Sequence, residues 1–557
     1  MTRGGAFSLQ IESERCGIDV EKSLRVAALQ INGFSFDDRD ECRAHIFEMI
    51  LKALKHNPDI VLLPECSYPS YCLRQWNEHI EKEIESILDE LSNVAKGNDV
   101  YIACGLPEVV LDEREVSTEN VIFNSLYVVD HTGEIKAIGR KRFLWHFDSD
   151  WFVPGTMSTV FDTKWGRIGL MVCADGRDPE ILQSLRLQGC KMILNSTNWV
   201  CNGRDRDKLS NPQVDYLMSV RARETGSWIV AANKVGIEDG FIVYCGNSMV
   251  VNPEGQVVAR AGSRLPDVII YDIPLNDTSN EILCGDDGLD DVPMHQPFTM
   301  INLNENAGKM ELKTADYIYI AAAQTGINCR KCRIEDVVSK VDIMCLRAKT
   351  CKADMLILDV DLRHVDEYED EPDISYHNLA MSIVDKMTCC PVDTLLHMKF
   401  DSSTAFDVFI CSNTDCNVTL LTCPIILQTD KFRFGVIDGS QFLNYDLSRT
   451  MMIAGSQLVV WMCDGSDQDY VAFARTRAME NRIYTVCMNG CAKREHAEAN
   501  DRGYNSLICD PDGKIIAETF EDTEQMICTY LDLSVTERKT VVPGTDVKKE
   551  AFSFRQV

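Results

Sequence analysis

The sequence predicts a layered α/β protein built from two similar halves. Short apolar and β-branched runs alternate with helix-like segments along all 557 residues, and several blocks of the first half recur in the second. Hydrophobic residues make up 45% of the chain, which is enough for substantial cores. Alternating strand and helix signals are typical of sheets covered by helices, and this length suits two domains.

Helical spacing of apolar residues predicts the helices in the first half. The clearest cases are residues 42–56, 81–96, 180–187 and 215–225. Between them, apolar runs such as 60–63 and 168–172 predict buried strands. Asp178 is a favourable N-cap and Pro179 a favourable first helical residue, so a helix is expected to begin just after the second of these strands.

Five blocks of the second half match blocks of the first half in the same order. The matched pairs are 320–324 with 26–30, 354–358 with 59–63, 433–436 with 167–170, 477–489 with 221–233, and 505–518 with 247–260. The period is too long for a solenoid of small repeats. The sequence therefore predicts a second domain of the same kind, spanning about residues 315–557.

Cys173 is the most informative single residue. It follows the apolar run 168–172, and the turn and helix signals of residues 174–180 follow at once. A thiol at such a strand-to-helix elbow points into the open end of a sheet, where helix amides favour the thiolate. The alternative is a buried structural cysteine, because this chain has 24 cysteines and free cysteine is commonly buried.

Two further segments place a carboxylate and an amine at strand ends. Glu65 follows the run 60–63, and Lys141 precedes an apolar run. Thiolate attack on a carbonyl needs a base for the thiol proton, positive charge at the developing oxyanion, and a proton for the departing amine. Glu65, Lys141 and Cys173 would supply these functions if the fold brings them together, and no histidine is required.

These segments resemble the nitrilase (carbon–nitrogen hydrolase) superfamily. The matching stretches are LLPE at Glu65, GRKRFLWHFD at Lys141 and GLMVCADGRDPE at Cys173, with supporting matches at 26–30, 151–155, 194–199 and 246–259. The resemblance covers about residues 23–302. It implies that Glu65 is the general acid/base, Lys141 the oxyanion stabiliser and Cys173 the nucleophile. It also implies that Asp148 is a supporting acid and that the backbone of Ala174 contributes to the oxyanion site.

The resemblance also implies an architecture for the whole chain. Each half is expected to be a four-layer αββα sandwich, and the two could pack as an intrachain pseudo-dimer, as family members commonly dimerise through helices next to the active site. We expect an N-terminal tail at 1–22, a catalytic domain at 23–302, a linker at 303–314 and a degenerate domain at 315–557. In the matched blocks Val360 stands where Glu65 does and Gly439 where Cys173 does, so the second half is predicted to be inactive.

The residues after the nucleophile indicate the substrate class. Ala174-Asp175 replaces the Trp-Glu of nitrile-hydrolysing relatives, which favours an amide over a nitrile. The spacing C-x-D-x-R-x-P-E resembles N-carbamoyl amino acid amidohydrolases, but the histidine of that branch is Phe143 here, so amidase and N-carbamoyl amidohydrolase both stay open. Arg177 could bind a substrate carboxylate or form an ion pair with Asp175 or Glu180. The other substrate-binding candidates are Asn198, Trp199, His146 and Tyr71.

Composition and the absence of targeting signals indicate which partners and which location to expect. The formal charge of -30 disfavours partners with a phosphate backbone or an anionic membrane surface. The sequence shows neither a signal peptide nor a bilayer-spanning apolar run, and a thiolate enzyme suits a reducing compartment, so a cytoplasmic location is expected. A lone CxxC at 329–332 is not a metal site, and no cofactor is expected. The competing class is a non-catalytic nitrilase-fold scaffold or small-molecule-binding protein. We expect a small-molecule substrate and a homo-oligomer or the intrachain pseudo-dimer.

Overall fold

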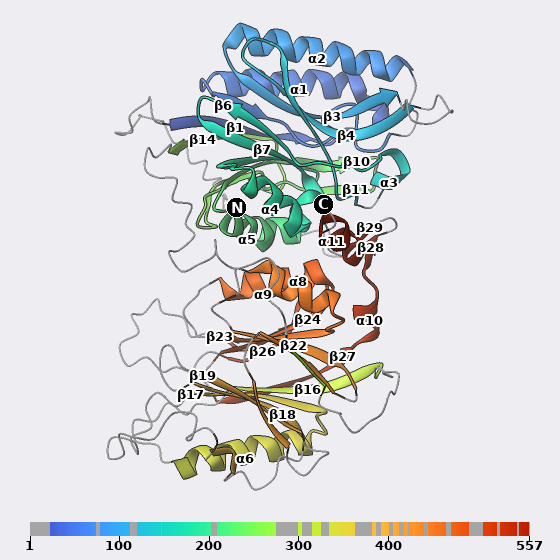
Figure 1. Cartoon of the computed structure of the whole chain (residues 1–557). Helices are drawn as coiled ribbons and strands as arrows, with labels where there is room; N and C mark the ends of the chain where they lie inside the picture. The colour runs from blue at the N-terminus through green and yellow to red at the C-terminus, as the bar shows by residue number, and fades with distance from the viewer. Residues whose placement is uncertain are drawn as a thin grey trace, which may run out of the picture.

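Four large sheets and their covering helices form the molecule (Figure 1). The computed structural model describes residues 23–73, 78–111, 120–145, 147–201, 209–274, 299–302, 315–324, 334–361, 381, 383–385, 392–399, 405–411, 417–421, 424–429, 431–438, 441, 444–463, 469–489, 505–520, 524–542 and 545–555. Within these ranges no helix is both long enough and apolar enough to cross a bilayer. The expected linker at 303–314, His146 and Gly439 lie outside the described residues.

The first half contains an eight-stranded and a six-stranded sheet. The larger has the order β11-β10-β1-β2-β3-β4-β5, with β14 also paired to β1. Its strands are β1 (Ser23–Asn32), β2 (Ile60–Leu62), β3 (Tyr101–Leu111), β4 (Asn120–Val129), β5 (Ile135–Arg140), β10 (Lys234–Glu238), β11 (Ile242–Cys245) and β14 (Asp267–Pro274). The smaller has the order β13-β12-β9-β8-β7-β6, made of β6 (Thr159–Thr163), β7 (Gly166–Val172), β8 (Met192–Ser196), β9 (Trp228–Ala232), β12 (Met249–Val251) and β13 (Val257–Arg260).

Helices cover both outer faces of this sheet pair. The expected helices at 42–56, 81–96 and 180–187 are confirmed, and that at 215–225 forms as a π-helical turn, Gln213–Leu217, continued by α5. The observed helices are α1 (Arg39–Leu54), α2 (Glu78–Asn98), the short α3 (Asp148–Trp151), α4 (Pro179–Leu187) and α5 (Met218–Thr225). Figure 1 shows α1 and α2 on one side and α4 and α5 on the other.

Strand β1 shows why the sheet is covered on both faces. Successive side chains of a strand point to opposite faces. Ala27, Leu29 and Ile31 belong to the core beneath α1 and α2. Leu24, Val26 and Ala28 alternate with them and belong to the core shared with the second sheet and with α4 and α5. Because both faces of β1 are apolar, this strand must lie between two layers.

The second half repeats this plan with a seven-stranded and a six-stranded sheet. Their orders are β15-β21-β22-β23-β24-β25-β26 and β20-β19-β18-β17-β16-β27. The first comprises β15 (Thr299–Asn302), β21 (Ile425–Gln428), β22 (Arg433–Asp438), β23 (Leu458–Cys463), β24 (Tyr484–Asn489), β25 (Leu507–Cys509) and β26 (Ile515–Glu518). The second comprises β16 (Tyr317–Gln324), β17 (Met355–Asp361), β18 (Asp393–Lys399), β19 (Ala405–Cys411), β20 (Asn417–Leu421) and β27 (Gln525–Asp532).

The helices of the second half complete the layers. Helices α8 (Tyr445–Ile453) and α9 (Tyr470–Asn481) cover the seven-stranded sheet, and α6 (Ile334–Thr350) packs on the six-stranded one. In Figure 1, α4 and α5 of the first half face α8 and α9 of the second. The predicted tandem of αββα sandwiches, packed through helices as a pseudo-dimer within one chain, is therefore confirmed.

Chain segments cross between the halves at two places. Strand β15, which the sequence assigned to the end of the first domain, pairs in parallel with β21 and so completes a sheet of the second half. The C-terminal segment runs the other way through α10 (Ser534–Glu537), the hairpin of β28 (Thr540–Val542) and β29 (Thr545–Asp546), and α11 (Val547–Arg555). Val547 is buried in the core of the first half, and the Thr545 hydroxyl donates to the Leu144 carbonyl at 2.5 Å.

Candidate active site

The predicted nucleophile lies at a strained turn between β7 and α4. Cys173 has φ of 46°, in the left-handed region that a residue with a side chain rarely adopts, and it begins the 3₁₀ turn Cys173–Arg177. The Asp178 side chain caps α4 by accepting from the Glu180 N–H at 3.1 Å, and Pro179 occupies the first turn, as predicted. The strand-to-helix elbow expected from the sequence is thus present, and strain of this kind is typical of active sites.

Lys141 lies between two carboxylates in the interior of the first half. Its Nζ is 2.6 Å from Glu65 Oε1 and 2.7 Å from Asp148 Oδ2, and all three side chains are at most 1% exposed. Glu65 follows β2, Lys141 follows β5, and Asp148 begins α3. Burial alone would lower the pKa of the lysine, but the charges of Asp148 and Glu65 raise it well above its usual value. The amine is therefore held as a cation.

Among the described residues, only one of the two Glu65 carboxylate oxygens has hydrogen-bond partners. Asn124 Nδ2 donates to Oε1 at 2.7 Å, the same oxygen that Lys141 contacts. Among the described residues, Oε2 is buried without a hydrogen-bond partner. Gly105 on β3 allows this placement, because a Cβ there would lie 2.6 Å from the Glu65 Cα. A buried carboxylate oxygen with no partner is rare and leaves that atom able to accept a proton.

Asp175 fastens the nucleophile turn to the segment that carries Lys141. Its Oδ1 accepts from the backbone N–H groups of Arg142 and Phe143 at 2.9 and 2.8 Å, and its Oδ2 accepts from that of Val172 at 3.0 Å. Burial raises the Asp175 pKa to about 6, although these backbone groups oppose the shift. One side chain therefore sets the spacing between Lys141 and Cys173.

The charges of Glu65 and Lys141 both affect the pKa of the Cys173 thiol. Burial, followed by the negative charge of Glu65, raises its pKa to about 12, while Lys141, the Thr197 hydroxyl and the Asn198 backbone N–H favour the thiolate. The Cys173 N–H donates to Asn195 Oδ1 at 3.1 Å. At neutral pH the sulfur is therefore protonated, so nucleophilic attack requires a base that removes its proton.

Two of the expected substrate-binding residues make contacts that position other groups. The Tyr71 hydroxyl donates to Asp148 Oδ1 at 2.9 Å. Trp199 is fully buried, and its indole N–H lies 3.2 Å from the Gln213 amide oxygen, with the amide oriented so that its nitrogen donates to the Cys173 carbonyl at 2.8 Å. Tyr71 thus orients the supporting acid, and Trp199 packs behind the nucleophile turn.

Two other candidates have polar groups that the fold leaves uncommitted. In the described part of the chain, neither side-chain polar atom of Asn198 has a hydrogen-bond partner, and no carboxylate lies within ion-pairing distance of Arg177. The Arg177 guanidinium lies 4.0 Å from the Trp145 ring centroid and donates to Met479 Sδ at 3.4 Å. The alternative ion pair with Asp175 or Glu180 is wrong, because Asp175 binds backbone groups and Glu180 pairs with another arginine.

Sequence reasoning missed several residues of the site. Asn124, Asp175 as a connector and Gln213 orient the site through hydrogen bonds to distant segments. No motif marks an amide that meets a carboxylate 59 residues away, as Asn124 meets Glu65. The oxyanion role of the Ala174 backbone stays a prediction, and the residue is buried in the 3₁₀ turn.

One group of side chains has metal-like geometry. Cys72, Glu238 and Asp239 offer ligand atoms within 4.8 Å of one another. Glu238 is already engaged, because it accepts from the Tyr71 and Cys72 N–H groups at 2.7 and 3.1 Å and from the Tyr244 hydroxyl at 2.7 Å. We therefore assign no metal to this group and no catalytic step to one.

Comparison with known proteins found a matching family, curated relatives and similar solved structures. The family described as carbon-nitrogen hydrolase matches residues 25–280 and 417–539. A probable nitrilase of Schizosaccharomyces pombe, C965.09, is 27% identical over 41% of this chain and 80% of its own length. The human ω-amidase NIT2 is 29% identical over 45% of this chain and 87% of its own. The crystal structure of an amidase from Nesterenkonia sp. is 23% identical, with a TM-score of 0.40 over 47% of this chain and 96% of that one.

The chain therefore belongs to the carbon–nitrogen hydrolase family, also called the nitrilase superfamily. Both matched regions fall on the two sandwiches, one in each half. It is a carbon–nitrogen hydrolase, as the sequence predicted.

Proposed function

We propose that the first half cleaves the amide C–N bond of a small, non-peptide substrate through a thioester on Cys173. The observation that carries this proposal is the buried arrangement of Glu65, Lys141 and Asp148 around the strained Cys173 turn. Three charged side chains, two from strand ends and one from the start of a helix, are costly to bury together, and such arrangements are typical of catalytic sites.

In the proposed mechanism, each proton transfer and each charge is assigned to a side chain or backbone group of this site. Glu65 Oε2 takes the thiol proton while the sulfur attacks the carbonyl carbon, and the resulting oxyanion is stabilised by the Lys141 cation and the Ala174 N–H. Glu65 returns the proton to the leaving amine as the C–N bond breaks. It then deprotonates water, which attacks the thioester and releases the carboxylic acid and the free thiol.

The uncommitted polar groups suggest a substrate that carries a carboxylate. Burial lowers the pKa of Arg177, whose unpaired charge would gain a partner in a substrate anion. Asn198 would bind the reacting amide or a neighbouring polar group. Relatives named ω-amidase support an amide, while the C-x-D-x-R-x-P-E spacing supports an N-carbamoyl amino acid.

We also propose that the second half performs no amide hydrolysis. Val360, at the position of Glu65, is fully buried and apolar, and Gly439 stands in the sequence where a thiol would be required. The two matched positions therefore carry neither the carboxylate nor the thiol that the mechanism uses.

A substrate panel tests the proposal. The full chain is incubated with ω-amides of dicarboxylic acids, N-carbamoyl amino acids, aliphatic amides and nitriles, and ammonia and carbon dioxide are measured. We expect ammonia from at least one amide class and none with Cys173→Ala. Carbon dioxide released together with ammonia identifies the N-carbamoyl class.

Intact mass separates an enzyme from a scaffold. A small electrophile should give one stable adduct at Cys173 in the wild type and none there in Cys173→Ala. If Cys173 reacts no faster than the other thiols and no panel member is cleaved, the chain is a scaffold and the proposal is wrong.

A further inference from the structure

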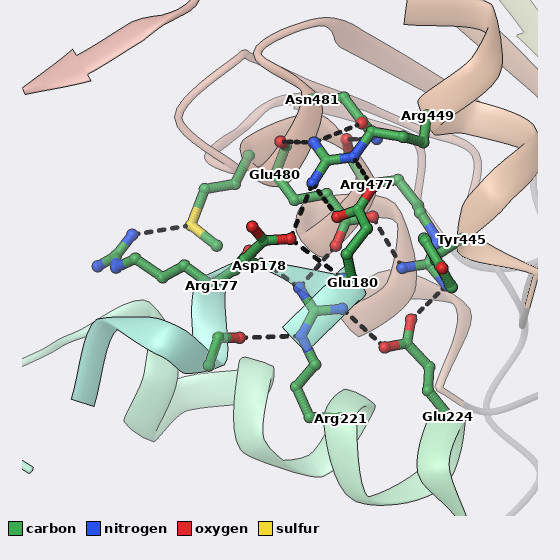
Figure 2. A network of polar contacts seen from close by, with 12 residues as sticks. Arg177, Asp178, Glu180, Arg221, Glu224, Tyr445, Arg449, Arg477, Glu480 and Asn481 are labelled. Carbon is green, nitrogen blue, oxygen red and sulfur yellow. Dashed lines mark hydrogen bonds and ion pairs between the residues drawn. The ribbon is translucent and has the colours of Figure 1, made fainter. Parts of the chain in front are cut away.

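Four buried charges form a closed ring between the two halves, as Figure 2 shows. Arg221 pairs with Glu224 and with Glu480, both at 2.7 Å. Arg477 pairs with Glu480 at 2.9 Å and also with Glu224. The matched blocks 221–233 and 477–489 place Arg221 opposite Arg477 and Glu224 opposite Glu480. The ring therefore has the reciprocal pattern of a two-fold interface, made here by one chain.

The ring also contacts the nucleophile turn directly. Arg221 Nε donates to the Gly176 carbonyl at 2.9 Å, and its Nη2 donates to the Arg177 carbonyl at 3.1 Å. Nη2 also contacts Glu480 Oε2 at 2.7 Å. A carboxylate of the second half thus orients the arginine that holds the backbone three and four residues after Cys173.

A second contact from the other half is one-sided. Arg449 on α8 binds the Glu180 carboxylate with two donors, Nε to Oε1 at 2.9 Å and Nη2 to Oε2 at 2.7 Å. It also lies 3.4 Å from Asp178 Oδ1. Extending the matched block 433–436 without gaps places Gln183 opposite Arg449, so the matched position of the first half is not an arginine. The two-donor contact holds the first turn of α4, directly after the nucleophile turn.

Burial makes these contacts geometrically strict. Arg221, Arg449 and Glu480 are each at most 3% exposed. A buried ion pair contributes little net stability compared with apolar packing, but two donors on one carboxylate fix its direction and distance. Such contacts therefore suit a positioning role better than a purely stabilising one.

We propose that Arg449 and Glu480 of the non-catalytic half are positioning residues for Cys173. Glu480 acts through Arg221 on the carbonyls of the turn, and Arg449 acts through Glu180 on the start of α4. Together they hold the sulfur at the distance from Glu65 and Lys141 that attack requires. The inference rests on the proposed role of Cys173 as nucleophile, and it gives the second half a task in the reaction of the first.

The test compares variants of the full chain on the panel substrate that the wild type cleaves. Arg449→Met removes the contact, Arg449→Lys keeps the charge without the planar two-donor geometry, and Glu480→Gln removes one ring charge. The double variant Glu180→Gln with Arg449→Met removes both charges of the 2.7 Å pair. Asp178 loses its longer contact with Arg449 but still accepts from the backbone N–H of residue 180, so the double variant should fold more readily than Arg449→Met. Asp469→Asn is the matched control, because Arg223 and Asp469 form a more exposed pair across the same interface at 3.0 Å.

We expect kcat to fall about 10²-fold in Arg449→Met and in the double variant, with KM changed less than about threefold, because a misplaced nucleophile slows attack more than binding. Arg449→Lys should recover part of the loss, Glu480→Gln should lose about tenfold, and Asp469→Asn should stay within about twofold. The rate of Cys173 alkylation, read by intact mass, should fall in the same order.

Two results would overturn the inference while the proposed function stands. One is a folded Arg449→Met or double variant with the kcat of the control. The other is a loss that follows only the unfolded fraction measured by circular dichroism. A wild-type protein whose Cys173 shows neither turnover nor selective alkylation overturns the proposed function and this inference with it.

Discussion

The two halves share a layered frame and differ at one sheet end. In the first half, Lys141 is buried between Glu65 and Asp148 beside the Cys173 turn. In the second, the matched position holds Val360, which is buried among apolar side chains. The frame depends on alternating apolar residues that many sequences supply, whereas the chemistry depends on a few buried charges that must all be present. Replacing these few charged residues therefore need not alter the layered fold.

The charges that the second half does retain lie at its interface. Arg477 and Glu480 mirror Arg221 and Glu224, and all four close one ring. The helices that meet there also begin alike, since Asn444 caps α8 through the Asp446 N–H at 3.0 Å as Asp178 caps α4. The second half therefore keeps the interface charges of the first half but not the residues at the positions of Glu65 and Cys173.

Removing the buried lysine should give the largest effect. Lys141→Met leaves Glu65 and Asp148 as unpaired neighbours, so we expect turnover to fall by about 10³-fold or more and stability by about 3–5 kcal/mol. Lys431→Met in the second half breaks a partly exposed pair with Asp354 and should cost about 0–1 kcal/mol with turnover unchanged. Urea unfolding and ammonia release measure both. Equal effects of the two changes would contradict the contrast between the halves.

The pH dependence of Cys173 alkylation tests whether Glu65 is its base. With the thiol pKa raised to about 12, the thiolate fraction alone rises about tenfold per pH unit at neutral pH. We expect the wild type to alkylate at a nearly constant rate from about pH 6.5 to 8.5, because Glu65 removes the proton in the same step. In Glu65→Gln the rate should be lower at pH 6.5 and should climb with pH. A wild-type rate that climbs equally steeply argues against this role.

A carboxylate placed in the second half should cost stability without giving activity. Val360→Glu buries an acid among apolar side chains, so its pKa in the folded state should rise. The folded protein then holds more protons than the unfolded one between the ordinary and the raised pKa, so stability falls as pH rises through that window. Against Val360→Gln, we expect an added loss of about 1–3 kcal/mol between pH 5 and 8. An unchanged difference would mean that the position tolerates charge.

Local patterns in the sequence were sufficient for the frame. Apolar alternation and the cap at Asp178 predicted the strands and helices, and the five matched blocks predicted the second sandwich. The segments around Glu65 and Lys141 predicted two side chains that do meet, and the role of Cys173 beside them stays a prediction. Each of these features depends on residues that are close in sequence, or on two segments with similar sequences. One amino-acid sequence is therefore enough to detect it.

The support of the site was decided by the tertiary structure. Asn124 on Glu65, Asp175 on the Lys141 segment and Tyr71 on Asp148 are contacts between distant segments, each made by one or two hydrogen bonds without a sequence pattern. The sequence also did not predict that β15 crosses into the second half. A short strand can pair with any free sheet edge that the fold places beside it.

The sequence by itself determined the class of protein and the repeated layers, and it proposed Glu65, Lys141 and Cys173 as the reacting side chains. Only the packed chain decided that Arg449 and Glu480, more than 250 residues from their partners, hold the start of α4 and the arginine beside the nucleophile turn. The physical reason is that a buried charge is stable only where it has an ion-pair partner and its hydrogen bonds are made. Those partners are brought together only when the surfaces of the two halves pack against each other.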